Sequence, residues 1–135
     1  HLSIRRQRQM CIRDRYDNRT QNKIPDIKWV TNYNKPVIIS EFGGGALYGR
    51  HGTIEERWTE EFQETLYINQ IKMLKKIDFL AGISPWILTD FRSPRRVLPG
   101  IQDFWNRKGL ISNNGEKKKA FYVLKDFYRE LVEAR

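Results

Sequence analysis

The sequence predicts an α/β fold whose strands run parallel. Two strands are predicted, at residues 37–41 and about 79–86. The first opens with the β-branched run 37–39, between Pro36 and the glycines 43–45, and the second opens with the run 79–84, which leads into Pro85. Between these runs, and again near the C-terminus, apolar residues recur every three or four positions, as in amphipathic helices. Because strand and helix alternate, right-handed crossovers should join the strands in an open doubly wound sheet or a barrel.

The first predicted strand ends in a carboxylate. A period of two places Val37, Ile39 and Glu41 on one face, with Ile38 and Ser40 on the other. A glutamate at a strand end, backed by apolar neighbours, is held rigidly and partly desolvated, as a carboxylate nucleophile or general base requires. From these residues alone, an ion pair with a neighbouring arginine explains such a glutamate at least as well.

The helix after this strand is expected over about residues 54–77. Its start is predicted at Thr53-x-x-Glu56, which has the form of a capping box. The glutamates 55, 56, 60 and 61 would then serve the helix N-terminus as capping and dipole-compensating residues. In the second predicted strand, Gly82, Ser84 and Trp86 share one face.

A last helix is expected after Asn113-Asn114-Gly115, with the three lysines 117–119 opening it on a solvated face. The formal charge of +9 suggests a basic module that binds nucleic acid, but residues 1–15 hold five arginines against one aspartate, so the rest carries +5. We therefore expect no nucleic-acid partner. No metal or cofactor is expected either, because neither zinc-ligand spacing nor a phosphate-binding glycine loop occurs.

Membrane association is not expected, because no apolar run approaches the roughly 18 residues of a membrane span. A single cysteine, Cys11, excludes an internal disulfide framework and does not indicate a compartment. Residues 10–15, MCIRDR, can be back-translated to an adapter used in sequencing libraries. Residues 1–15 are therefore expected to be non-native, with 16–135 as the folded part; the alternative is a natural basic arm.

Five segments occur in the order and spacing of family 2 glycoside hydrolases, the β-glucuronidase and β-galactosidase family, which the chain resembles from about Trp29 to its end. The segments are KPVIISEFG at 35–43, WTEEFQ at 58–63, WILTDF at 86–91, NRKGL at 106–110 and KKKAF at 117–121. The resemblance implies the C-terminal portion of a (β/α)8 TIM barrel, about its last two βα units. This barrel would be incomplete, because a whole one needs about 250 residues.

The chemistry that the resemblance implies is retaining hydrolysis of β-glycosidic bonds with Glu41 as the nucleophile. A second carboxylate, roughly 5 Å away, would protonate the leaving oxygen and later activate water. In the family this acid/base is the glutamate of an Asn-Glu pair, and no Asn-Glu pair occurs in this sequence. We therefore expect the acid/base to lie outside this chain and the isolated chain to be inactive.

The resemblance also implies a carbohydrate partner and three substrate-binding residues. Asn106 and Lys108 match the Asn-x-Lys pair that binds the sugar carboxylate in members that cleave glucuronides, and Trp86 offers an aromatic face to the sugar ring. Phe104 and Trp105 replace glycines of the family pattern and could be a pocket wall or a loop anchor. β-Glucuronides are the favoured substrates. The first alternative is a β-galactosidase or other neutral β-glycosidase, and the second is a basic non-enzymatic binding module. Whether the full-length parent enzyme forms a homo-oligomer is left open.

Overall fold

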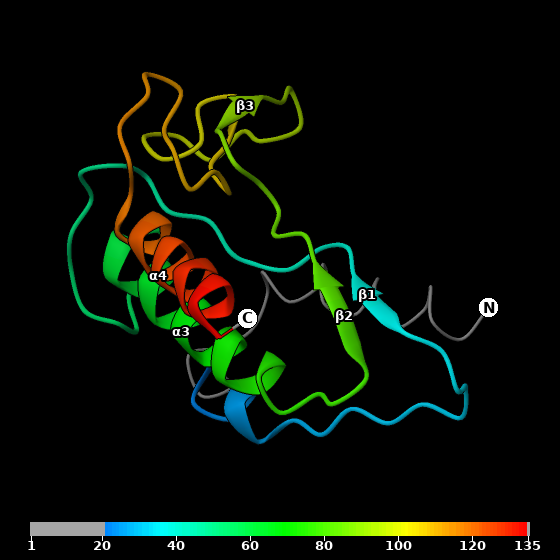
Figure 1. Cartoon of the computed structure of the whole chain (residues 1–135). Helices are drawn as coiled ribbons and strands as arrows, with labels where there is room; N and C mark the ends of the chain where they lie inside the picture. Colours follow the sequence, from blue (N-terminus) through cyan, green and yellow to red (C-terminus); the bar gives the residue numbers. More distant parts are fainter. Residues whose placement is uncertain (1–20, 135) are drawn as a thin grey trace.

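A computed structural model of the protein describes residues 21–134, so the expectation that residues 1–15 are non-native lies outside the described part of the chain. Two helices lie side by side, with a two-stranded sheet beyond them and a loop-rich region above (Figure 1). The elements in chain order are η2 (Ile24–Asp26), β1 (Val37–Ile39), α3 (Glu60–Leu74), β2 (Leu80–Ile83), β3 (Phe91–Arg92), β4 (Trp105–Asn106) and α4 (Lys119–Glu133).

Strands β1 and β2 pair in parallel, with Val37 opposite Leu80 and Ile39 opposite Ile83. Their hydrogen-bond ladder continues past the strands, because the Trp86 N–H donates to the Phe42 carbonyl at 2.8 Å. Helix α3 lies between the two strands in the chain. The predicted pair of parallel strands joined by a helix is thus confirmed, and both strands lead into the predicted site segments at the same end.

Helix α3 begins later than predicted. Its N-cap is Thr59, whose extended backbone (φ −80°, ψ 156°) lets Oγ1 accept the Phe62 N–H at 3.1 Å. The predicted start at Thr53 is wrong because residues 54–57 form turns and bends, and Trp58 has a φ of 71°, which a right-handed helix does not permit. The helix also ends at Leu74, so the predicted span of 54–77 is too long at both ends.

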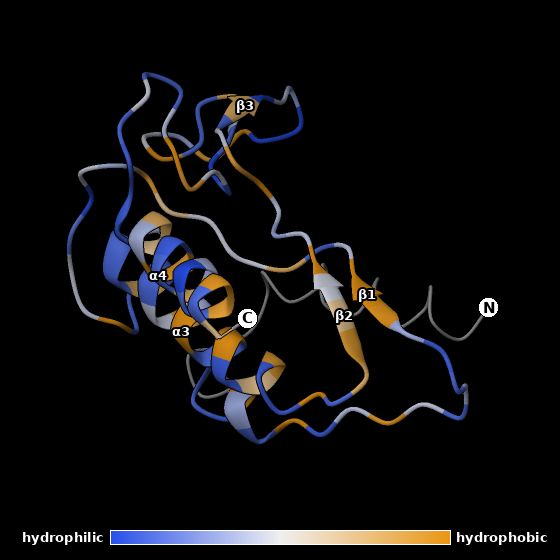
Figure 2. Ribbon diagram, viewed as in Figure 1, coloured by the Kyte–Doolittle hydropathy of each residue, from blue (hydrophilic) through white to orange (hydrophobic). Residues whose placement is uncertain are grey.

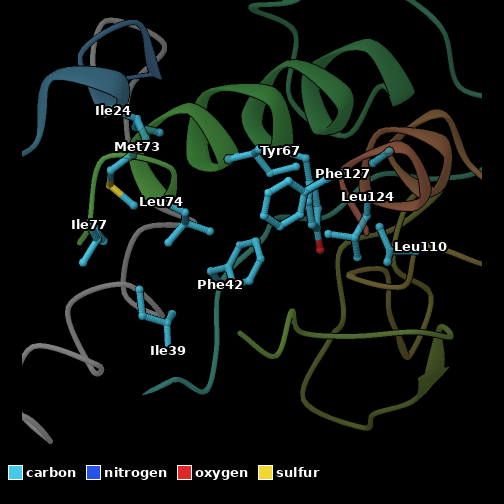
Figure 3. Close-up of a cluster of buried hydrophobic side chains, with 12 residues drawn as sticks. Ile24, Ile39, Phe42, Tyr67, Met73, Leu74, Ile77, Leu110, Leu124 and Phe127 are labelled. Atoms are coloured by element: carbon cyan, nitrogen blue, oxygen red, sulfur yellow. The ribbon is translucent and has the colours of Figure 1, made fainter. Parts of the chain in front are cut away.

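The hydrophobic core lies between the sheet and the two helices (Figure 3). Ile39 and Phe42 meet Tyr67 from α3 and Leu124 and Phe127 from α4 in one buried cluster. Figure 2 shows how strongly apolar β1 is. Within β1 the predicted alternation holds, because Ile39 is 5% exposed and its neighbour Ile38 is 63% exposed.

The alternation stops where β1 ends. Phe42, rather than Glu41, is the next residue to join the buried cluster, while Ser40 is exposed and Glu41 half-buried. The prediction that Glu41 continues the apolar face of Val37 and Ile39 therefore does not hold, because the strand conformation that imposes a period of two ends at Ile39.

The start of α4 contradicts the prediction of three solvated lysines. Lys118 is the N-cap residue and is completely buried, while its own side chain makes no capping bond. The carboxylate of Glu60, on α3, caps α4 instead: its Oε2 accepts the Lys119 N–H at 2.9 Å. The burial of Lys118 therefore comes from contacts with parts of the chain outside α4, which helical spacing alone does not reveal.

The stretch between β2 and α4 contains a short antiparallel pair of β3 and β4. The guanidinium groups of Arg92 and Arg107 lie 4.8 and 5.6 Å from the ring centre of Trp105. Of the two roles considered for Trp105, the loop anchor agrees with these contacts. Between residues 21 and 134, no helix has the length and apolar character needed to cross a membrane.

Candidate active site

Glu41 lies just beyond the C-terminal end of β1, half-buried, and is followed by the glycines 43–45. Gly43 has a φ of 123°, and a side chain there would collide with the Tyr67 hydroxyl group. The glycine therefore lets the chain turn closely past α3 immediately after Glu41. In α/β folds with parallel strands, this end of the sheet carries the chemistry.

Backbone hydrogen bonds bring the three predicted site segments together. The Phe42 carbonyl, next to Glu41, accepts the Trp86 N–H at 2.8 Å. The following residue, Ile87, donates to the Lys108 carbonyl at 3.3 Å and accepts the Leu110 N–H at 3.0 Å. The segments that carry Glu41, Trp86 and Lys108 are thus neighbours beyond the carboxyl ends of β1 and β2.

Trp86 is 37% exposed. Phe91 contacts it edge to face, with ring centres 6.2 Å apart and an interplanar angle of 87°. The peptide bond between Trp86 and Ile87 is cis. A partly exposed aromatic ring, steadied by a second ring, can stack on the apolar face of a sugar.

Asn106 and Lys108 are held in one tight turn. The Oδ1 atom of Asn106 accepts the Lys108 N–H at 3.1 Å, and the two residues are only 5% and 8% exposed. Since Oδ1 accepts this bond, the Nδ2 group is the part of the Asn106 amide that could donate to an anionic ligand. Beside this turn, Phe104 is exposed and has a φ of 65°.

A buried ion pair that sequence reasoning missed lies behind this turn. The Lys118 Nζ is 2.9 Å from Oδ1 and 3.0 Å from Oδ2 of Asp90. Burial raises the pKa of the Asp90 carboxyl and lowers the pKa of the Lys118 ammonium, and the attraction between the two charges opposes both shifts. Asp90 and Lys118 lie in two of the segments that resemble family 2 glycoside hydrolases, at 86–91 and 117–121. The resemblance did not reveal that the two side chains form an ion pair.

A second network joins the N-termini of α3 and α4 near the surface. Glu61 accepts bonds from the Lys119 ammonium at 2.7 Å and from the Gly52 N–H at 3.2 Å, and lies 2.9 Å from the His51 ring. The bond from Lys119 is the main reason that the pKa of the Glu61 carboxyl is lowered to about 2. Among residues 21–134, no group of three or more His, Cys, Asp or Glu residues is placed to hold a metal ion.

Comparison with known proteins identifies the class that this fold and site define. A β-glucuronidase of Streptococcus agalactiae is 36% identical over 107 residues, covering 79% of the chain and 16% of the relative. Human β-glucuronidase is 31% identical over 110 residues, covering 77% and 16%. No protein-family model matches the chain. The relatives confirm the resemblance seen in the motifs: the chain is related to the family 2 glycoside hydrolases, and it spans about one sixth of the length of the curated relatives.

Two solved structures of similar fold are, like the curated relatives, of enzymes named for uronic acids. A β-D-glucuronidase of Dictyoglomus thermophilum superposes with a TM-score of 0.70 at 27% identity, over 87% of the chain and 20% of that structure. A family 2 β-galacturonidase of Eisenbergiella tayi, bound to galacturonate, gives a TM-score of 0.64 at 29% identity, over 71% and 17%.

Proposed function

We propose that this chain supplies about the last two βα units of a TIM-barrel catalytic domain, in an enzyme that hydrolyses β-glycosidic bonds with retention of configuration. The observation that carries the proposal is the parallel ladder from β1 to β2, continued by the bond from Trp86 to Phe42. It puts Glu41 and Trp86 at the same carboxyl end of the strands, where barrel enzymes carry their catalytic residues.

In the proposed mechanism, the Glu41 carboxylate attacks the anomeric carbon of the sugar and forms a glycosyl ester. A second carboxylate, roughly 5 Å away, protonates the leaving oxygen and then removes a proton from the water that hydrolyses the ester. We expect that acid/base in another part of a longer enzyme. The isolated chain is accordingly expected to be inactive.

The proposed substrate is a β-linked uronic acid, with glucuronides favoured. Lys108 can supply an ammonium and Asn106 an amide N–H to the sugar carboxylate, and charge-assisted hydrogen bonds of this kind are strong. Support comes from the names of the relatives, β-glucuronidase and β-galacturonidase, since glucuronate and galacturonate share the carboxylate. Trp86 would contact the apolar face of the same ring.

The test is turnover by the full-length enzyme that contains this chain. Nitrophenyl β-glucuronide, β-galacturonide and β-galactoside are compared, and proton NMR follows the configuration of the sugar first released. We expect the uronides to be preferred and the β anomer to be released first. Release of the α anomer first would contradict retention, and preference for the galactoside would favour the neutral β-glycosidase.

A further inference from the structure

Two buried side chains, one from each helix, bind the same two loops. We call residues 43–46, which follow Glu41, the glycine loop, and residues 106–110 the lysine turn. Gln63, on α3, is completely buried, and its Nε2 donates to the Gly44 carbonyl at 2.8 Å and to the Gly109 carbonyl at 3.2 Å. One amide group of α3 therefore joins the glycine loop to the lysine turn.

Lys118, the N-cap residue of α4, makes the same connection from the other helix. Its Nζ donates to the Ala46 carbonyl at 2.6 Å and to the Arg107 carbonyl at 3.2 Å, in addition to both oxygens of Asp90. Like Gln63, it thus binds one carbonyl in the glycine loop and one in the lysine turn. Asp90 extends the connection to the segment that begins at Trp86.

The two loops also contact each other directly, and the lysine turn packs closely against Asp90. The Ala46 N–H donates to the Arg107 carbonyl at 2.9 Å, and the Gly109 N–H donates to Oδ1 of Asp90 at 2.8 Å. A side chain at Gly109 would collide with the backbone of Asp90 and would come within 2.5 Å of the Ile111 carbonyl. The relative position of the loops is therefore tightly determined.

The contacts of Gln63 and Lys118 fix the arrangement of the two loops in addition to stabilising the fold. A buried ammonium loses its hydration, and well-packed apolar residues often stabilise a core as well as a buried ion pair does. What Gln63 and Lys118 add is direction, because each donates hydrogen bonds to carbonyl oxygens of two separate loops. Such bonds fix one arrangement of the loops, whereas apolar packing would tolerate several.

We propose that Gln63 and Lys118 are positioning residues that set the place of the lysine turn relative to Glu41. This inference rests on the proposed function. In the proposed enzyme, Gln63 and Lys118 align the uronate held by Asn106 and Lys108 with the attacking carboxylate of Glu41. A displacement of about 1 Å at a reacting centre can lower the rate about 100-fold. Neither residue contacts the sugar in this proposal.

Hydrogen–deuterium exchange of the full-length protein tests the positioning role without using activity. Gln63→Met and Lys118→Met keep the side-chain length and remove the donors. We expect amide exchange in the glycine loop and the lysine turn to rise about tenfold or more, as for a local opening, while the interior of α3 keeps its protection. The matched controls are Gln70→Met, buried on the same helix, and Lys119→Met, the adjacent lysine, and neither should alter exchange in the two loops.

Kinetics of the same variants test the consequence for the substrate. Both positioning variants should lower kcat/KM for the β-glucuronide by about tenfold or more, when rates are referred to the folded protein, and should change kcat/KM for a neutral β-glycoside much less. A purely structural role would lower the amount of folded enzyme and leave kcat/KM of the folded fraction unchanged for both substrates, and this result would overturn the proposal. If Lys118→Met does not fold, the kinetics of Gln63→Met alone decide whether the positioning role holds.

The two proposals can fail separately. If the wild-type enzyme cleaves no β-glycoside, the proposed function fails, whereas the exchange pattern still decides whether Gln63 and Lys118 hold the two loops together. If wild-type turnover is normal and exchange in the loops does not change in either positioning variant, only the positioning role is overturned.

Discussion

Asp90 and Lys118 form an ion pair that solvent does not reach: Nζ lies 2.9 Å from Oδ1, and both side chains are 0% exposed. Removing Lys118 leaves the buried Asp90 carboxylate with one ion-pair partner, the Arg107 guanidinium 3.5 Å from Oδ2. Lys118→Met should therefore lower the free energy of unfolding by about 3–5 kcal/mol. Adding Asp90→Asn removes the second charge and should restore part of this loss.

Urea-induced unfolding of the two single variants and the double variant measures the coupling between Asp90 and Lys118. The loss in the double variant is expected to be clearly smaller than the sum of the two single losses. Additive losses would mean that the two charges do not stabilise each other in the folded protein.

Lys108→Ala should weaken glucuronide cleavage selectively. The lost charged hydrogen bond is worth about 1.5–3 kcal/mol, or roughly a 10- to 150-fold loss in kcat/KM for the glucuronide. Neutral β-glycosides lack the carboxylate and should be affected far less. The comparison is made against Lys117→Ala, an exposed lysine near the start of α4. An equal loss on every substrate would mean that Lys108 is structural, and the neutral-glycosidase alternative would gain.

Glu61 makes the contact between α3 and α4 sensitive to acid. Because its pKa is lowered from 4.5 to about 2, chiefly by the bond from Lys119, its contribution to stability is complete above about pH 4.5 and is lost as the pH falls towards 2. The stability difference between wild type and Glu61→Gln should thus be constant near neutrality and shrink over this window. Thermal unfolding followed from pH 7 to pH 2 checks this, and a difference that does not depend on pH would contradict it.

Much of the arrangement of the candidate site could be predicted from local sequence patterns. The β-branched run before Glu41 and the apolar run before Trp86 each define a strand, and alternation with a helix makes the strands parallel, so both residues reach one end of the sheet. Asn106 and Lys108 are two residues apart in the chain, so the Asn-x-Lys motif was enough to predict that they lie next to each other.

Other features depend on contacts that no local pattern contains. The burial of Lys118 arises because Asp90, 28 residues earlier in the chain, meets it in the core. Helix α3 starts at Glu60 because Trp58 takes a left-handed conformation, which overrides the capping-box pattern at Thr53. Strands β3 and β4 have only two residues each, too few to produce a recognisable alternation.

Glu41→Gln should remove nearly all turnover from the full-length enzyme. The amide keeps the shape of the side chain but cannot form a glycosyl ester, so kcat should fall by well over ~100-fold. Circular dichroism and the melting temperature should match the wild type. Glu55→Gln, at an exposed glutamate in the turn before α3, is the matched control and should keep full activity. Activity of Glu41→Gln within a few-fold of wild type would mean that the nucleophile lies elsewhere.

Trapping the covalent intermediate tests most directly whether Glu41 is the nucleophile. A β-glucuronide that carries a good leaving group, and fluorine in place of the hydroxyl group beside the anomeric carbon, should inactivate the full-length enzyme, because its glycosyl ester hydrolyses slowly. After digestion, mass spectrometry should find the sugar on the peptide that contains residues 35–43, attached to Glu41. A label on a different carboxylate, or turnover without any trapped ester, would contradict a nucleophilic role for Glu41.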